Sequence, residues 1–317
     1  MNTQSFGSNP APDGAGDAGN RAQALANRFA VPVALVVLYI VWGSTYLGIR
    51  YAIETIPPFL MASIRFLVAG VLLYVLLRAR GAPNPSPRQW LSGTIVGVLL
   101  LAGGNGLVGF GEQYVASGLA AVLIGTVPLW AALFAGIWGL WPRRLESGGL
   151  VVGFLGLAVL NTSSGLHGHP LAAGILIFAA ISWAFGSVWS RSLPMPPGMM
   201  ASATEMLTGG VVLLAMSLVR GERFAHGPSP TSVWALIYLI VFGSFIAFTA
   251  YNYLLQHVRP ALATSYAYVN PMVAVILGVA LVGEKVSASE VVALLIVVTG
   301  VGLVIMGRQR QQAESSA

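Results

Sequence analysis

Ten apolar runs follow one another along this chain, each close to the roughly twenty residues that a helix needs to cross a bilayer. Proline, glycine or charged residues punctuate the gaps between the runs, and those gaps are too short for a soluble domain. The pattern predicts an all-α integral membrane protein with ten transmembrane helices. The predicted spans are about residues 32–50, 58–78, 90–110, 117–140, 146–162, 171–190, 198–219, 233–254, 260–282 and 288–306.

Short strings of the first half return in the second half. The matched elements are PPFLMAS at 57–63 with PPGMMAS at 196–202, the Trp42–Arg50 spacing with the Trp183–Arg191 spacing, and Gln113, Leu119 and Pro128 with Gln256, Leu262 and Pro271. Five spans lie on each side of the midpoint, so the second unit enters the membrane inverted. Inverted repeats are a recurring architecture of secondary transporters, with the substrate site between the two halves near the midplane.

The repeat divides the chain into two units of five helices, at residues 31–162 and 163–307. Residues 1–30 are polar and predict a disordered tail, and residues 308–317 form a second short tail. No A-x-A-like site follows the first apolar run, so we expect a retained helix rather than a cleaved signal. With the N-terminus in the cytoplasm, eleven basic residues lie inside and four outside. This bias predicts that both termini are cytoplasmic.

Composition supports the membrane prediction and narrows the chemistry. Hydrophobic residues make up 56% of the 317 and charged residues only 8%, against about 25% charged in soluble domains. The absence of cysteine excludes disulfides and thiolate chemistry. The net charge of +6 does not indicate nucleic-acid binding, because the arginines are scattered at the ends of spans rather than gathered on one face.

Pro128 and Pro271 lie inside predicted spans at matched positions of the two units. Proline removes a backbone donor and frees a carbonyl one turn earlier, and matched interruptions in two halves indicate a transport site. Polar residues flank both prolines, with Thr126 near the first and Tyr266 and Asn270 near the second. The alternative is a kink filled by packing. We predict that these five residues contribute to a substrate site.

Two tryptophans are also matched, Trp42 within WGSTY at 42–46 and Trp183 within WAFGS at 183–187. Each is deep in its span rather than at the interface where aromatic residues usually gather. A buried indole either packs between helices or stacks on a ligand, and the sequence leaves both open. The candidate substrate-binding residues added here are Trp42, Tyr46, Asn105, Trp183 and Asn252. For Asn105 and Asn252, hydrogen bonding between helices is the alternative role.

Arg65 and Glu205 are ionisable residues about seven positions into the second and seventh spans. Charged groups in a span are costly and are functional candidates by default. For Arg65 the sequence favours a structural role, because its long side chain extends toward the headgroups. Glu205 is a candidate for proton coupling, and an ion pair is the alternative for either residue.

The sequence has no cofactor or metal motif that is accompanied by the structural elements or further ligands such a site needs. GNGLVG at 104–109 matches G-x-G-x-x-G, but it ends an apolar span and lacks the acidic residue of a dinucleotide site. His167 and His169 lack a third ligand. We see no Walker lysine and expect neither cofactor nor enzymatic activity.

The chain resembles the EamA-type transporters of the drug/metabolite transporter superfamily, and within them the YedA-like bacterial inner-membrane group. The residues that carry the resemblance are WGSTY at 42–46, RFLVAG at 65–70, SWAFGS at 182–187, PALATSYAYVNP at 260–271 and Gly283-Glu284. It implies two five-helix repeats, a multi-pass protein of the bacterial inner membrane, and export of amino acids or related metabolites. It also implies a central cavity whose lining includes Trp42, Asn105, Trp183, Asn252, Tyr266 and Asn270.

These observations predict a secondary transporter that moves a small zwitterionic or neutral metabolite outward by alternating access. Its partners are then a small-molecule substrate and the lipid bilayer, and the sequence leaves monomer and homodimer open. A flippase for a lipid-linked or polyprenyl-linked substrate is the main alternative. A membrane enzyme would need clustered acids or histidines at one membrane face, and a channel would need a continuous polar stripe. We find neither.

Overall fold

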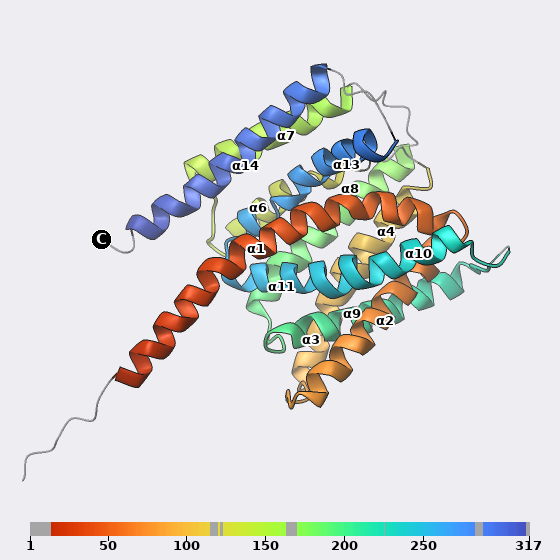
Figure 1. The fold of residues 1–317 in the computed structure, drawn as a ribbon, viewed down its shortest axis with the longest axis horizontal. Coiled ribbons are helices and arrows are strands. Elements are labelled where there is room, and N and C mark those ends of the chain that lie inside the picture. The colour runs from red at the N-terminus through yellow and green to blue at the C-terminus, as the bar shows by residue number, and fades with distance from the viewer. Residues whose placement is uncertain are drawn as a thin grey trace, which may run out of the picture.

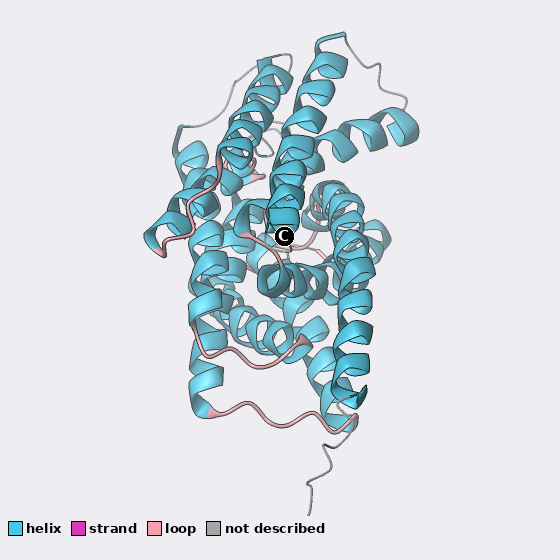
Figure 2. Cartoon of the chain, turned by 90° about the vertical axis from the view of Figure 1, so that its left-hand side faces the viewer, coloured by secondary structure: helices cyan, strands magenta, loops and turns pink. Residues whose placement is uncertain are grey.

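The computed structural model describes residues 14–114, 120, 123–162, 170–224, 226–282 and 288–314. Every regular element within those ranges is helical (Figure 2). The first half contains α1 (Gly14–Ile53), α2 (Pro58–Ala79), α3 (Pro87–Gly97), η1 (Val98–Gly106), α4 (Leu107–Gly111), α6 (Val127–Ile137) and α7 (Arg144–Thr162). The second contains α8 (Pro170–Trp189), η2 (Ser190–Ser192), α9 (Met199–Val219), α10 (Pro230–Tyr238), η3 (Leu239–Ile246), α11 (Ala247–His257), α12 (Pro260–Ala263), α13 (Tyr266–Val282) and α14 (Ala288–Glu314).

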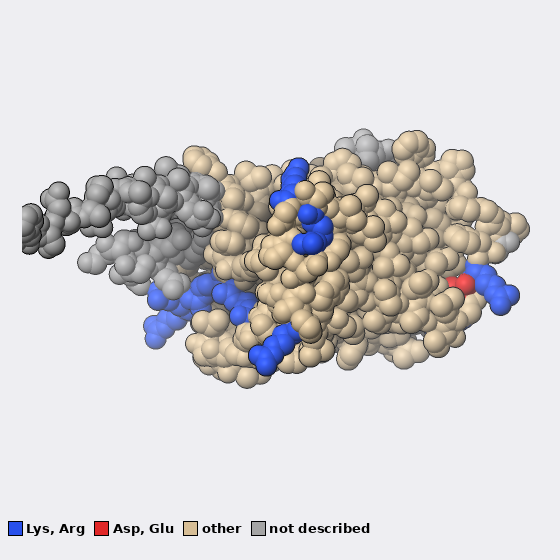
Figure 3. Space-filling view, turned by 90° about the horizontal axis from the view of Figure 1, so that it is seen from below, with Lys and Arg blue, Asp and Glu red and all other residues tan. Residues whose placement is uncertain are grey.

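Six helical stretches within the described residues are long and apolar enough to cross a membrane. They are Phe29–Ile53, Pro58–Ala79, Pro87–Gly111, Pro170–Ser192, Met199–Val219 and Pro230–His257. Shorter apolar helices cover Val127–Ile137 and Leu295–Val304. In Figure 3 a zone without charged residues separates the basic groups on one part of the visible face from a basic and an acidic group at the opposite tip. The all-helical prediction is confirmed for the described residues, and the count of ten helices stays a prediction.

Two boundaries differ from the sequence prediction. α1 begins at Gly14, so the second half of the tail predicted as disordered is helical. Residues 14–28 contain five alanines with leucine, glutamine and two arginines, which are good helix formers that extend an apolar helix at little cost. The predicted span 117–140 is not one helix, because a turn at residues 125–126 precedes α6. His167, His169 and Gly283-Glu284 lie outside the described residues.

The repeat is visible in how the third helix of each half begins. Ser86 caps α3 and Ser229 caps α10, and each serine is followed by a proline in the first turn. The Ser86 hydroxyl accepts from the Gln89 amide, and the Ser229 hydroxyl accepts from the Ser232 amide. A serine cap followed by proline satisfies an orphan amide and presets the first helical turn. The same local chemistry therefore starts both helices.

Each of these helices then passes into a π-helix, η1 after α3 and η3 after α10. π-helices are rare and occur frequently at functional sites. The apolar pattern gave no signal for them, because a wider turn leaves the residue types unchanged. Their paired occurrence places similar irregular backbone in both halves.

The two halves pack against each other through equivalent helices. α2 packs on α9, and α7 lies beside α14 along one edge of the molecule (Figure 1). α1 belongs to the first half but packs on α10, α11 and α13, while α8 belongs to the second half but packs on η1, α4 and α6. Each half thus places one long helix in the other, and the side chains of Trp42 on α1 and Trp183 on α8 contact each other.

Small residues allow the close contacts. A Cβ at Gly93 or Gly97 of α3 would meet Thr204 or the Glu205 carbonyl of α9, at 2.7 Å and 2.6 Å. Glycine at such positions lets helix backbones approach within a membrane. The GxxxG pair of α3 therefore serves packing within the chain.

Candidate functional site

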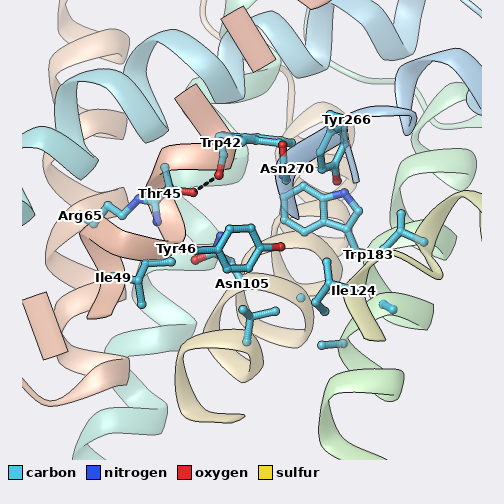
Figure 4. Close-up of a pocket in the computed structure, with 15 residues that line it drawn as sticks. Trp42, Thr45, Tyr46, Ile49, Arg65, Asn105, Ile124, Trp183, Tyr266 and Asn270 are labelled. Carbon is cyan, nitrogen blue, oxygen red and sulfur yellow. Dashed lines mark hydrogen bonds between the residues drawn. The ribbon is translucent and has the colours of Figure 1, made fainter. Parts of the chain in front are cut away.

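A cavity opens between α1 and α8, with about 540 Å³ of empty space including its open mouth (Figure 4). Its lining draws on both halves and on the η1 π-helix. The lining residues are Trp42, Thr45, Tyr46, Ile49, Arg65, Gly104, Asn105, Val108, Ile124, Val127, Ala179, Ala180, Trp183, Tyr266 and Asn270.

The matched tryptophans meet each other in this cavity. The rings of Trp42 and Trp183 lie edge to face, with centroids 5.6 Å apart and planes at 79°. Trp42 also contacts Tyr266 at 4.6 Å, and Tyr251 lies within 5.5 Å of Trp183 and Tyr266. Edge-to-face pairs are favoured by the ring quadrupoles. The result is an aromatic cluster of Trp42, Trp183, Tyr251 and Tyr266 at the junction of the two halves.

Hydrogen bonds hold the indole rings in place. The Trp42 Nε1–H donates to the Gly243 carbonyl of η3 at 3.0 Å. The Trp183 Nε1–H donates to the Tyr251 hydroxyl at 3.0 Å, and that hydroxyl is also bonded to Ser187. Both acceptors, the Gly243 carbonyl and the Tyr251 hydroxyl, belong to the second half. With their N–H groups bonded, the indole rings present apolar surface to the cavity. Packing and cavity lining, which the sequence left as alternatives, both occur.

The structure brings six of the ten predicted substrate-binding residues to the cavity. The lining contains Trp42, Tyr46, Asn105, Trp183, Tyr266 and Asn270, and it does not contain Thr126, Pro128, Asn252 or Pro271. Sequence reasoning missed Tyr251, which lies next to Asn252 and closes the aromatic cluster. It also assigned Arg65 a structural role, and this residue lines the cavity.

The prolines act on backbone shape rather than on the cavity surface. Pro128 lies in the first turn of α6, where a missing amide costs nothing, and the turn before it holds Thr126, whose hydroxyl donates to the Leu123 carbonyl. Pro271 lies inside α13, and the break in that region falls earlier, at the turn Thr264–Ser265 that follows α12. Each half therefore contains one helix break that precedes its proline, but the number of residues between the break and the proline differs between the halves. Residues beside the breaks, including Val127 and Tyr266, reach the cavity.

Asn252 and Glu205 form a separate buried polar pair. The Asn252 amide donates to Glu205 Oε2 at 2.6 Å and to Ser202 Oγ at 2.9 Å, and Glu205 is 1% exposed. These residues join α11 to α9 behind the cavity wall. The sequence alternative for Asn252, a hydrogen bond between helices, therefore matches its contacts.

Replacing Glu205 with glutamine should leave transport intact, because a glutamine oxygen still accepts from Asn252. Replacing it with alanine should lower stability by about 1–3 kcal/mol, because the buried Asn252 donor loses its acceptor. The measurement is transport by the two variants in vesicles, with and without a pH gradient, beside their unfolding temperatures. Loss of gradient-driven transport in the folded Glu205→Gln variant would instead support proton coupling.

Arg65 is the charged residue of the cavity wall. It is 2% exposed, its Nε–H donates to Ser244 Oγ of η3 at 2.7 Å, and its guanidinium lies 4.8 Å from the centre of the Phe66 ring. No carboxylate of the described residues forms an ion pair with it. η3 thus positions two parts of the site, through the Gly243 carbonyl on Trp42 and the Ser244 hydroxyl on Arg65.

Comparison with known proteins shows which family has this architecture. The EamA-like transporter family matches residues 30–162 and again 170–306. The chain is 48% identical over 276 residues to the uncharacterized inner membrane transporter YedA of Escherichia coli K12, covering 87% of this chain and 90% of YedA. It is 27% identical to the WAT1-related protein At3g02690, chloroplastic, of Arabidopsis thaliana, covering 85% of this chain and 68% of that protein.

A solved crystal structure has the same fold, with a TM-score of 0.74 at 20% identity over 87% of this chain and 98% of that one. Two matched ranges, one in each half, agree with the paired helices, paired π-helices and paired tryptophans described above. The chain therefore belongs to the EamA-like transporter family, as a membrane transporter with two copies of the family domain, and its described regular elements are all helical.

Proposed function

We propose that this protein is a secondary transporter that exports a small metabolite, an amino acid or a related zwitterionic or neutral compound, across the cytoplasmic membrane. The proposed fold has ten transmembrane helices as two inverted five-helix repeats, with both termini in the cytoplasm. The observation that carries the proposal is the cavity at the junction of the halves, where Trp42 of one half meets Trp183 of the other.

The way the halves interlock supports alternating access. α1 and α8 each lie in the opposite half, so a rocking of one half against the other changes the packing around both tryptophans. A site at such a junction can open to one face and then to the other, as in transporters built from inverted repeats. The energy then comes from the gradient of the substrate or of protons.

The chemistry of the lining supports a small, partly apolar substrate. Aromatic and aliphatic side chains form most of the wall, and Asn105 and Asn270 supply amide groups. Aromatic rings offer flat apolar contact, and a few placed polar groups orient a ligand. One guanidinium in the lining does not match a polyanion, which would need several cations.

The test is comparative metabolite profiling of the medium from cells that overproduce the wild-type protein or its Asn270→Ala variant. We expect one metabolite to be enriched at least about tenfold with the wild type alone, because the alanine variant loses a buried polar contact worth about 1–3 kcal/mol. Membrane quantities of both proteins are measured beside the media. Identical media from two well-produced proteins would refute export of a small metabolite under those conditions and favour a lipid-linked substrate.

A further inference from the structure

Two buried polar groups of the cavity lining lack hydrogen-bond partners. Arg65 Nη1 and Asn270 Oδ1 are both buried without a partner, and the two side chains are 2% and 3% exposed. Buried donors and acceptors are almost always paired in native proteins, and an unpaired one needs an explanation. One is a cationic donor and the other a neutral acceptor, and both belong to the same cavity.

The repeat fold itself does not require this cation. Counted from the matched prolines Pro57 and Pro196, Arg65 corresponds to Thr204 in the second half. Thr204 bonds to the Met200 and Ala201 carbonyls of its own helix and does not line the cavity. At this matched position the cation is therefore a feature of the first half only, and the second half has the acid Glu205 at the next residue.

The surroundings of Arg65 fix the guanidinium instead of neutralising it. Ser244 orients its Nε, and a Cβ at Gly243 would lie 2.9 Å from Nη2 and 3.1 Å from Thr45, so glycine leaves the space that the guanidinium fills. A hydroxyl and an aromatic ring do not balance a buried cation, and a cation without a counter-charge is costly within a membrane. The remaining N–H groups form a fork that matches a carboxylate.

We propose that Arg65 binds the carboxylate of the transported molecule and that Asn270 Oδ1 accepts a hydrogen bond from its amino group. This inference rests on the proposed function, because it names the chemistry of the molecule that the cavity transports. In Figure 4 Arg65 lies on one side of the view and Trp183 and Tyr266 on the other, with Tyr46 between them. The aromatic wall then receives the apolar part of the same molecule. The substrate class is an α-amino acid with an apolar or aromatic side chain.

The experiment measures binding to the purified full-length protein in detergent, from the rise of its unfolding temperature with ligand concentration. The probes are L-phenylalanine, L-leucine and L-threonine, their amides, which lack the carboxylate, and 3-phenylpropionate, which lacks the amine. Wild-type protein should bind at least one amino acid about tenfold or more tightly than its amide. Absence of binding by all three amino acids would overturn the proposal.

Substitutions of Arg65 and Asn270 test which group of the ligand each residue binds. Arg65→Gln should weaken binding of the amino acid about 10- to 100-fold and leave the amide unchanged, with Arg65→Lys in between. Asn270→Ala should weaken L-phenylalanine but not 3-phenylpropionate. The matched control is Arg191→Gln, since Arg191 donates to the Leu255 and Val258 carbonyls outside the cavity, and it should keep the wild-type preference. An unchanged preference in Arg65→Gln would refute the assignment.

The unfolding temperature without ligand separates a binding role of Arg65 from a purely structural role. Without ligand, Arg65→Gln should unfold at the wild-type temperature or above it, because it removes a buried charge that has no counter-ion. A clearly lower temperature would mean that Arg65 holds the helices together, and would overturn its role as a binding group. Export of a molecule without a carboxylate would refute the Arg65 site but keep the transporter, whereas binding with the expected preference and no export would refute the transporter and keep the site.

Discussion

Trp42→Ala and Trp183→Ala should each abolish transport while the protein still inserts into the membrane. Each indole forms part of the cavity wall and contacts the other across the junction of the halves. Truncation removes the shared wall and opens a void where the two repeats must move together. The loss should be similar in the two variants because the tryptophans occupy matched positions. Transport of the exported metabolite into inverted vesicles measures it.

Substitution of Trp42 by phenylalanine separates the role of the ring from the role of its N–H group. Trp42→Phe keeps a ring but removes the Nε1–H that donates to the Gly243 carbonyl, so we expect partial activity. The matched control is Trp234→Ala, because Trp234 is 70% exposed and lies outside the cavity, and it should retain wild-type transport. Equal transport by Trp42→Ala and wild-type protein would remove the aromatic cluster from the site.

Gly300→Val should cause the largest loss of stability among the substitutions considered. A Cβ at Gly300 of α14 would lie 2.5 Å from the Gly153 nitrogen and 2.8 Å from the Gly149 carbonyl oxygen of α7. Those neighbours are backbone atoms and cannot rotate away, so α7 and α14 must separate. Overpacking of this kind typically costs about 1–3 kcal/mol, and backbone contact on both sides places this case at about 3 kcal/mol or more. The unfolding temperature of the detergent-purified protein measures it.

The same helix supplies the control. A Cβ at Gly302 meets nothing within 4 Å, so Gly302→Val should leave the unfolding temperature almost unchanged. Because helix propensity changes equally in the two variants, their difference isolates the contact between α7 and α14. Equal stability of the two variants would contradict the close packing of this pair.

The helical class and the paired halves could be predicted because both depend on patterns that can be recognised in the sequence alone. Apolar length fixes where helices cross a membrane, and the matched Trp42 and Trp183 follow from one repeated unit. Both tryptophans lie in the central part of helical stretches that are long and apolar enough to cross a membrane. The prediction failed at α1, where the helix formers of residues 14–28 extend the helix beyond the apolar run.

The cavity lining was less predictable, because it depends on which face of each helix points inward. Asn252 and Asn105 cannot be distinguished from the sequence, because each is a single polar residue within an apolar helix. In the structure Asn105 lines the cavity, while Asn252 turns to Glu205. Asn105 lies within the η1 π-helix, whereas Asn252 lies in α11, and a wider helical turn leaves no mark on residue type. Arg65 was read as structural from its depth alone, since the absence of a partner is a property of packing.

Alternating access requires that the cavity between the halves is reached from both sides of the membrane in turn. The chain has no cysteine, so a single introduced thiol can report access without background. Val108→Cys places a thiol in the lining, and Val96→Cys, fully buried outside the lining, is the control. The measurement is the rate of labelling by a membrane-impermeant thiol reagent in right-side-out and in inverted vesicles. We predict that the Val108→Cys thiol reacts from both sides and the Val96→Cys thiol from neither, whereas reaction of Val108→Cys from one side only, or from none, would contradict alternating access.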